Sequence, residues 1–192
     1  MSHYYSEKQD SEFKLNKITE ILRKQEYSFF TSSGVFSKKK VDFGTRVLVN
    51  NMVLSKKDRV LDLGCGIGIV GRVVADLVKE VVMTDVNERA VKLAKMNTKG
   101  LKNVDVIQGN MYEKVEGKFN VILLNPPQTA GKKICMEMIR IAKDFLVEKG
   151  NLQIVARHNK GGETLSKYMK EVYGNMETIV KQGGYRVYLS KA

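Results

Sequence analysis

The residues best suited to chemistry stand directly after an apolar run of the chain. The run KFNVILL (118–124) leads without a spacer into Asn125-Pro126-Pro127. An asparagine carboxamide oxygen accepts hydrogen bonds, and two successive prolines stiffen the backbone and bring no N–H donor to compete for nearby carbonyls. Asn-Pro is also a common turn signal, so a plain polar turn is the alternative interpretation, although a fully apolar strand less often ends this way. The tripeptide therefore marks a candidate site at the end of a strand.

A glycine-rich segment upstream is typical of a loop that approaches a cofactor. In RVLDLGCGIGIVG (59–71), an apolar run carrying Asp62 breaks into Gly64, Gly66 and Gly68 and then into an apolar helical stretch. A buried strand that turns into a helix through glycines brings the backbone close to a ligand, because glycine has no Cβ to obstruct it. The carboxylate of Asp62 is suited either to binding a cofactor ammonium or to fixing the loop. Alone this motif is weak, since a tight turn without a ligand has the same pattern.

Two further apolar runs also end in polar residues. EVVMTD (80–85) closes on Asp85, 21 residues after Gly64, the spacing at which an acid commonly receives ribose hydroxyls in dinucleotide-type folds. VDVIQG (104–109) is followed by Asn110. A surface acid closing a strand is the plainer interpretation of Asp85. Because parallel strands present their carboxyl ends at one edge of a sheet, however, all these motifs should converge on one ligand site.

The elements that must position these residues alternate regularly from position 59 onward. This alternation predicts an α/β fold with a Rossmann-like, doubly wound, mostly parallel seven-stranded sheet. Gly183-Gly184 predicts the turn of a C-terminal antiparallel hairpin, and Asn87 is suited to cap a helix. The expected strands span 59–63, 80–85, 104–109, 118–124, 151–157, 177–181 and 185–189, and the expected helices span about 68–78, 87–99, 132–147 and 163–172.

A short N-terminal extension precedes this core. Residues 11–25 have apolar positions at roughly helical spacing and predict an amphipathic helix, whereas YSFFT (27–31) is aromatic and predicts a strand. The stretch RVLVNNMVL (46–54) predicts a helix that Thr45 is suited to cap. We expect a single domain over 1–192, with 1–58 as extension and lid and 59–192 as the Rossmann-like core.

Composition narrows the class of partner. With 33 Lys and Arg against 21 Asp and Glu, the net charge of +12 favours a polyanion, with nucleic acid the expected class, although a lysine-rich surface also serves solubility. Cys65 and Cys135 form no CxxC pair, so we expect no metal site, no disulfide framework and a reducing, cytoplasmic setting. The chain has no apolar run of membrane-spanning length, and we expect no membrane partner.

Taken together, DLGCGIG (62–68), Asp85, Asn110-Met111 and the NPP tripeptide resemble class I S-adenosylmethionine-dependent methyltransferases. Further upstream, HYYS (3–6) and FFTSSGVFSKKKVDFGT (29–45) resemble the small-subunit ribosomal RNA guanine-N2 methyltransferase group and its single-domain, archaeal-type relatives. The bacterial members carry a second, degenerate half, and we expect this chain of 192 residues to have no room for it. The chain also has Gln128 where they place an aromatic residue after NPP.

The resemblance implies a single methyltransferase domain, S-adenosylmethionine as cofactor and methyl transfer to the exocyclic N2 amine of a guanosine in RNA, with ribosomal RNA expected. It implies that the Asn125 oxygen and the Pro126 carbonyl accept the two amine hydrogens, so that catalysis consists of positioning and electrostatics. Phe36 and Tyr112 are candidates for stacking on a base. The expected catalytic residues are Asn125, Pro126 and Pro127; the expected cofactor-binding residues are Thr45, Asp62, Gly64, Gly66, Gly68, Asp85, Val86, Asn110 and Met111; the expected substrate-binding residues are Phe36, Lys38, Lys39, Lys40, Lys132 and Lys133.

Three other functions remain open from the sequence. One is methylation of adenine N6 in nucleic acid, and another is methylation of a glutamine amide in a translation factor. The glutamine-specific enzymes typically have Tyr after NPP, so Gln128 and the positive charge argue against that assignment. The third is a nucleic-acid-binding relative that does not turn over, which the presence of Asp85 and Asn125 disfavours.

Overall fold

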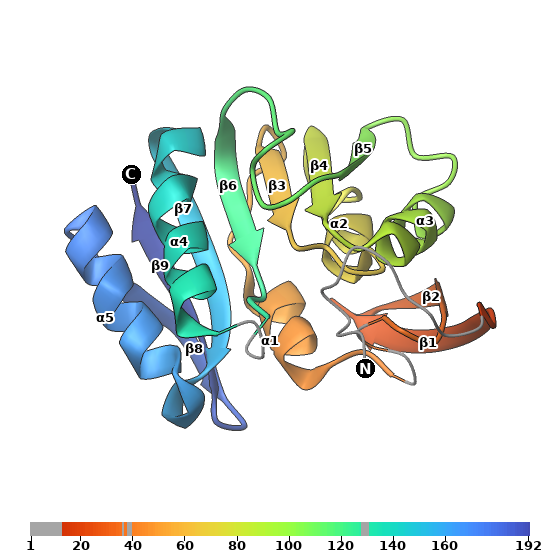
Figure 1. Ribbon diagram of the computed structural model, residues 1–192, viewed down its shortest axis with the longest axis horizontal. Coiled ribbons are helices and arrows are strands. Elements are labelled where there is room, and N and C mark those ends of the chain that lie inside the picture. Colours follow the sequence, from red (N-terminus) through yellow and green to blue (C-terminus); the bar gives the residue numbers. More distant parts are fainter. Residues whose placement is uncertain (1–12, 36, 38–39, 128–130) are drawn as a thin grey trace.

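The computed structural model of the chain contains the expected seven-stranded sheet, with strand order β5-β4-β3-β6-β7-β9-β8 (Figure 1). It describes residues 13–35, 37, 40–127 and 131–192. The strands β5, β4, β3, β6 and β7 are parallel, and β9 runs antiparallel to both of its neighbours, β7 and β8. The predicted Rossmann-like fold with a C-terminal antiparallel hairpin is therefore confirmed.

The strand and helix bounds lie close to the expected ones from residue 59 onward. The strands are β1 (Asn16–Leu22), β2 (Gln25–Thr31), β3 (Arg59–Leu63), β4 (Glu80–Asp85), β5 (Val104–Gln108), β6 (Phe119–Leu124), β7 (Leu146–Arg157), β8 (Glu177–Gln182) and β9 (Tyr185–Lys191). The helices are α1 (Phe43–Asn51), α2 (Ile69–Val74), α3 (Glu88–Asn97), α4 (Lys132–Ala142) and α5 (Gly162–Tyr173), with short 3-10 turns η2 (Lys143–Phe145) and η3 (His158–Lys160).

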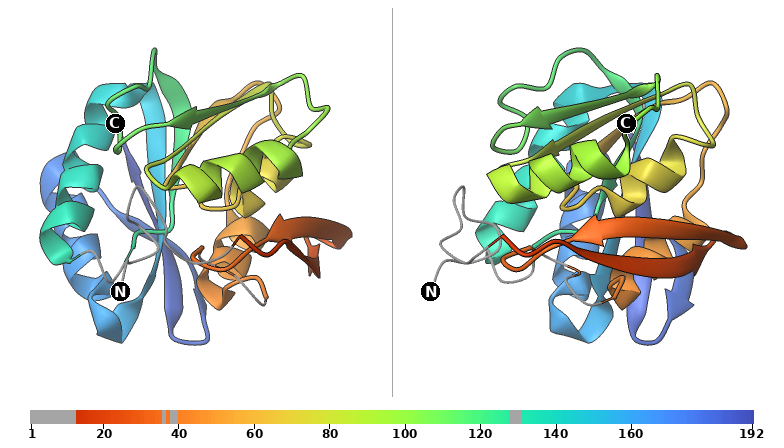
Figure 2. Two further views of the ribbon diagram at one scale, coloured as in Figure 1. Left: turned by 45° about the vertical axis from the view of Figure 1, so that its right-hand side comes forward. Right: turned by 90° about the vertical axis from the view of Figure 1, so that its right-hand side faces the viewer.

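Helices cover both faces of the sheet, which explains why its central strands are apolar throughout rather than alternating. Helices α1, α2 and α3 pack on one face, and α4 and α5 pack on the other (Figure 2). Alternate residues of one strand enter the two resulting cores: Val60 belongs to the first and Leu61 to the second, and both are fully buried. None of the helices among the described residues is long and apolar enough to cross a membrane.

The strand order creates a topological switch point beside β3. From β3 the chain moves outward to β4 and β5, and it then returns to the other side of β3 to form β6. The loops after β3 and β6 therefore diverge to opposite faces of the sheet and leave a crevice at the carboxyl ends of these two strands. This is the position at which open α/β sheets bind their ligands.

The predicted N-terminal helix is wrong over its described part, because residues 16–31 form a two-stranded antiparallel hairpin, β1–β2. Arg23 and Lys24 both adopt positive φ at its turn, and the side chains of Ile18, Glu20 and Leu22 alternate toward the protein. The apolar residues mimic helical spacing because Ile21 lies on the outer face and is 66% exposed. The strand predicted at 27–31 is confirmed as part of β2.

Asn97, the last residue of α3, ties this hairpin to the core. Its Oδ1 accepts a hydrogen bond from the Phe30 backbone N–H (2.7 Å), and its Nδ2 donates to the Phe30 carbonyl (3.0 Å). The same Nδ2 donates to the carbonyl of Ile67 in the glycine-rich loop (2.8 Å). One side chain therefore connects an edge strand of the hairpin with the loop between β3 and α2.

Three smaller expectations need correction. The cap of α1 is Asp42, whose carboxylate accepts a hydrogen bond from the backbone N–H of Thr45 (3.2 Å), so the hydroxyl of Thr45 is left for another contact. Helix α4 ends at Ala142 rather than near 147, and β7 begins at Leu146 rather than at 151. The expected cap at Asn87 and the glycine turn at 183–184 are both present, with positive φ at both glycines.

Candidate active site

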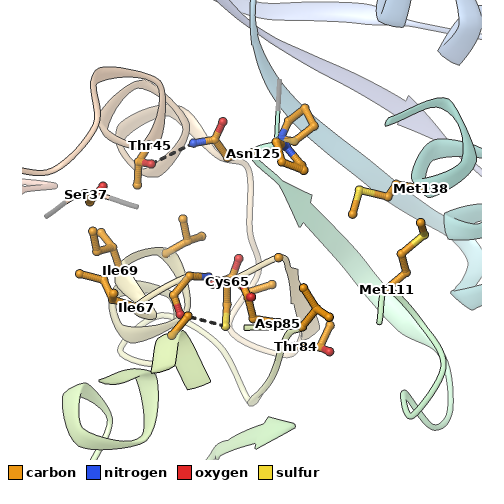
Figure 3. A pocket seen from close by; sticks show the side chains of 18 of the residues that line it. Ser37, Thr45, Cys65, Ile67, Ile69, Thr84, Asp85, Met111, Asn125 and Met138 are labelled. Atoms are coloured by element: carbon orange, nitrogen blue, oxygen red, sulfur yellow. Dashed lines mark hydrogen bonds between the residues drawn. The ribbon is translucent and has the colours of Figure 1, made fainter. Parts of the chain in front are cut away.

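A cavity of about 710 Å³ occupies the crevice at the carboxyl ends of the strands (Figure 3). Its walls come from the loops after β3, β4, β5 and β6 and from α1, α4 and the start of β9. The volume lies within the range of about 300–1,000 Å³ that is usual for small-molecule sites. The structure brings together in this wall the following residues predicted from the sequence: Thr45, Asp62, Gly64, Gly66, Asp85, Val86, Asn110, Met111, Asn125, Pro126 and Pro127.

The glycine-rich loop forms the floor of the cavity. Gly64 and Gly66 have φ of 69° and 55°, a left-handed conformation that favours glycine. A Cβ at either position would meet no protein atom within 4 Å, so both glycines border open space. The backbone N–H groups of Gly64 and Cys65 both donate to the Thr84 carbonyl at 2.9 Å, which fastens the loop to β4. The loop therefore presents bare backbone to whatever fills the cavity.

Gly68 has a different role from the other two glycines, because it is not part of the cavity wall. It precedes α2 with φ of 83°, and a Cβ there would lie 2.7 Å from Met83 Cε and 3.2 Å from the Ala94 Cα. The residue therefore allows α2, α3 and β4 to pack closely. Its predicted part in cofactor binding is at most indirect.

Asp85, at the end of β4, is held by backbone donors from two loops. Its Oδ2 accepts a hydrogen bond from the Gly66 N–H and its Oδ1 accepts one from the Asn87 N–H, both at 2.8 Å. Burial raises the pKa of this carboxyl above its ordinary value, while these N–H groups oppose the rise. Each oxygen keeps a lone pair after these bonds, so the carboxylate can still receive a pair of hydroxyls.

Asp62 lies deeper, within β3, and is 3% exposed. Its Oδ2 accepts a hydrogen bond from the backbone N–H of Gly71 (2.8 Å) and so fixes the first turns of α2 against the strand. Burial is the main cause that raises the pKa of Asp62 from 3.8 to about 7, and the charge of Asp85 raises it further. A cation entering the cavity would compensate this buried charge.

Asn125 is oriented by a hydrogen bond to α1. Its Nδ2 donates to the Oγ1 of Thr45 at 3.0 Å, and both side chains project into the cavity (Figure 3). Among the residues that the structure describes, Asn125 Oδ1 has no hydrogen-bond partner, which leaves it as an acceptor. Pro126 and Pro127 follow in the wall without any N–H of their own. This corner of the cavity therefore offers acceptors rather than donors.

The predicted substrate-binding residues are only partly placed. Lys40 is exposed before α1, and Lys132 and Lys133 are exposed in the first turn of α4, after the NPP segment. None of these three lysines is part of the cavity wall. Phe36, Lys38 and Lys39, together with Gln128, lie outside the described residues. The role of Tyr112 as a stacking candidate is not supported, because its ring is buried against Phe145 and its hydroxyl donates to the Met138 carbonyl.

Several wall residues were missed from the sequence. Ile134 and Met138 of α4 and Ala90 of α3 add an apolar surface, and Tyr185 at the start of β9 adds the single aromatic side chain among the described wall residues. The tilted ring of Tyr185 packs on Phe43 with a centroid distance of 5.6 Å. The sequence carried no local signal for this residue, since Tyr185 reaches the carboxyl edge only because β9 pairs with β7.

The described part of the chain contains no cluster of three or more His, Cys, Asp or Glu side chains suited to a metal ion. Cys65 and Cys135 are both buried and free. Burial raises the pKa of each thiol, which disfavours the thiolate needed for nucleophilic chemistry. The site therefore contains acids, amides and bare backbone rather than a nucleophile.

The chain matches the family model of the methyltransferase small domain over residues 26–189. This match covers most of the sequence, and the chain therefore belongs to the methyltransferase small domain family. The cavity is accordingly the candidate active site of a methyltransferase.

Among curated proteins, the chain is 34% identical to the uncharacterized protein YbxB of Bacillus subtilis (strain 168), covering 98% of both chains. It is 30% identical to ribosomal RNA small subunit methyltransferase C of Haemophilus influenzae, covering 87% of this chain and 52% of that protein. The chain thus spans about half the length of this relative.

Among solved structures, the 16S rRNA N2 methyltransferase of T. thermophilus, determined in complex with AdoMet and guanosine, superposes with a TM-score of 0.82 at 21% identity. The match covers 94% of this chain and 51% of that one. A methyltransferase from Pyrococcus furiosus gives a TM-score of 0.63 at 22% identity. At these identities the likeness shows a common fold.

Proposed function

We propose that this protein transfers a methyl group from S-adenosylmethionine to the exocyclic N2 amine of a guanosine in ribosomal RNA. The observation that carries the proposal is the orientation of Asn125. Its amide nitrogen is occupied by Thr45, so its oxygen is the free acceptor in the same cavity as Asp85 and the glycine-rich loop.

The residues of the cavity fit S-adenosylmethionine. Open space over Gly64 and Gly66 would be filled by its methionine portion, and Asp85 would receive its ribose hydroxyls. Val86, Asn110 and Met111 line the part of the wall next to Asp85, where the adenine would lie.

When bound, S-adenosylmethionine supplies a methyl group attached to a positively charged sulfur. The bond from sulfur to this methyl group breaks during transfer, and the sulfur is left as a neutral thioether. The protein must then improve a poor nucleophile, because the lone pair of the exocyclic amine is delocalised into the base. The Asn125 Oδ1 and the Pro126 carbonyl accept the two amine hydrogens and favour the pyramidal form of the nitrogen. As the new N–C bond forms, one of these protons leaves to solvent. No strong base is required, because positioning and electrostatics supply the acceleration.

Two observations favour ribosomal RNA as the substrate: the positive net charge of the chain and the identity of its relatives. The chain carries a net charge of +12, and its relatives include ribosomal RNA small subunit methyltransferases. Lys40, Lys132 and Lys133 are exposed on segments that lead to or from the cavity wall, where RNA phosphates would pass. We place the reaction in the cytoplasm, since both cysteines are free thiols.

The test is incorporation of tritiated methyl groups into small-subunit ribosomal RNA transcribed in vitro, and into subunits assembled from it, followed by nucleoside analysis. We expect the label in N2-methylguanosine. Label in N6-methyladenosine, or in protein alone, would contradict the proposed target.

The mechanism is tested by Asn125→Ala. Removing the acceptor should lower kcat at least about a hundredfold, in line with the loss of one preorganised polar group, while calorimetry shows unchanged affinity for S-adenosylmethionine. Asn120→Ala is the matched control, because Asn120 lies at the other end of β6, where its Oδ1 accepts a hydrogen bond from the Arg59 N–H (2.8 Å). It should cost stability and leave kcat unchanged. Full activity of the Asn125 variant would refute the mechanism.

A further inference from the structure

A second hollow, of about 260 Å³, lies between η3 and the β8–β9 turn. In Figure 1 this turn lies at the lower end of the sheet, where the arrowheads of β6 and β7 also point. The two walls are joined by a hydrogen bond from the His158 backbone N–H to the Gly184 carbonyl (2.9 Å). This hydrogen bond fixes the main chain on both sides of the hollow. The hollow lies at the same edge of the sheet as the cavity.

The hollow is positively charged. Lys181 and Arg186 line it together with His158, and none of the described residues that line it is acidic. Glu163 on α5 lies close enough to feel the charges of His158 and Arg186, and it is paired with Lys167 at 2.8 Å. Lys167 is the main cause that lowers the pKa of Glu163, and the charges of His158 and Arg186 lower it further. An exposed lysine and a half-buried arginine thus line a small hollow whose neighbouring carboxylate is already partnered.

Tyr185 separates this hollow from the large cavity and lines both of them. Its ring is held against Phe43 at the start of α1, and a Cβ on Gly44 would lie 2.9 Å from that ring, so α1 packs tightly against it. Two positions after Phe43 on the same helix, Thr45 holds Asn125. One aromatic side chain therefore lies between the proposed reaction centre and the basic hollow.

We propose that the hollow lined by Lys181 and Arg186 binds a backbone phosphate of the RNA next to the nucleotide whose base enters the cavity, with Tyr185 as the wall between base and phosphate. An enzyme that acts on a base must take it out of the stack, and it must then hold the neighbouring backbone in place. Arginine and lysine side chains are the usual phosphate ligands in such contacts. The hollow's volume is below the usual range for whole small-molecule ligands, which suits a single phosphodiester group.

This inference rests on the proposed RNA substrate and extends it to residues that sequence patterns did not single out. The test is the double variant Lys181→Gln, Arg186→Gln, assayed on in vitro transcribed small-subunit ribosomal RNA. We expect KM for the RNA to rise about tenfold or more, since charged hydrogen bonds to the phosphate are removed, while kcat and the affinity for S-adenosylmethionine stay unchanged. The dependence of log K for RNA binding on log salt should become shallower by roughly 0.7 for each phosphate that the variant no longer neutralises.

The matched control is Lys56→Gln, Lys57→Gln, which removes two exposed lysines from the turn before β3, at the opposite end of the sheet. It should keep the wild-type KM and salt slope. The single variant Lys181→Gln, exposed on a hairpin, serves if the double variant melts early. A salt slope and KM equal to those of the control overturn the inference. If the wild-type protein binds S-adenosylmethionine but methylates no RNA, the proposed function fails, and the salt slope alone then decides whether the hollow binds phosphate.

Discussion

The buried carboxyl of Asp62 makes a quantitative prediction about stability. Burial raises its pKa from 3.8 to about 7 in the folded protein, and the group is fully solvated when the chain unfolds. Each pKa unit corresponds to about 1.4 kcal/mol, so keeping this carboxylate charged costs the folded state about 4 kcal/mol above neutral pH. The variant Asp62→Asn keeps an acceptor for the Gly71 N–H and removes the charge.

The sign of the pH dependence follows from proton binding. Between about pH 4 and pH 7 the folded protein holds a proton on Asp62 that the unfolded chain has lost, so the wild-type free energy of unfolding falls as the pH rises through this window. Above about pH 7 the carboxyl is ionised in both states, and this contribution to the free energy of unfolding falls no further. The variant lacks this component, and it should be more stable than wild type at pH 8 by up to about 4 kcal/mol, with little difference at pH 4.

Urea unfolding of the ligand-free protein from pH 4 to pH 8 provides the measurement. Asp105→Asn, which removes an exposed carboxylate from β5, is the matched control and should keep the wild-type slope. A variant at position 62 with the same slope as wild type, or with lower stability at pH 8, would show that the carboxylate is compensated within the folded protein. The reasoning from burial would then be refuted.

Two further changes test how the site is held. Thr45→Val removes the acceptor for Asn125 Nδ2 and should lower kcat by roughly tenfold to a hundredfold through misplacement of the amide, with rescue by Thr45→Ser. A loss of affinity for S-adenosylmethionine at unchanged kcat would instead make this threonine a cofactor ligand. Gly68→Ala combines positive φ with a clash against Met83 Cε and a tight approach to the Ala94 backbone, and it should lower the unfolding free energy by about 2–3 kcal/mol in urea titrations. Gly100 also has positive φ but has open space around it, so Gly100→Ala measures the backbone strain alone. It should lower the unfolding free energy by less than Gly68→Ala does.

The sequence predicted the sheet well because its strands are buried on both faces. Continuous apolar runs ending in Asp85 or Asn125 have few alternative structures, and the topology brings their ends to one edge. The first strand of the N-terminal hairpin was missed because Ile21 is apolar yet exposed, which gave residues 16–22 the spacing of a helix.

The wall residues that belong to a sequence motif were predicted. The wall residues that reach the cavity only through the tertiary structure were missed. Tyr185 reaches the cavity because β9 inserts between β7 and β8, a pairing distant in sequence that no local pattern reveals. Thr45 was assigned to a cap because the helix was expected to begin at Arg46, whereas α1 begins at Phe43 and is capped by Asp42. The hydrogen bond from Asn125 to Thr45 joins residues 80 positions apart, and sequence reasoning had no access to it.

The hydrogen bonds of Asn97 to β2 and to the glycine-rich loop have a consequence for the order of folding. An isolated two-stranded hairpin is at best marginally stable in water, and Phe30, which Asn97 binds, lies 67 positions earlier in the chain. During synthesis β1 and β2 are made before α3, so the contact with Asn97 forms only after 67 further residues have been added. The hairpin can therefore contact α1 early, through the Arg23 N–H and Asn50, whereas the contacts that Asn97 makes with Phe30 and with Ile67 of the glycine-rich loop form only once α3 is in place.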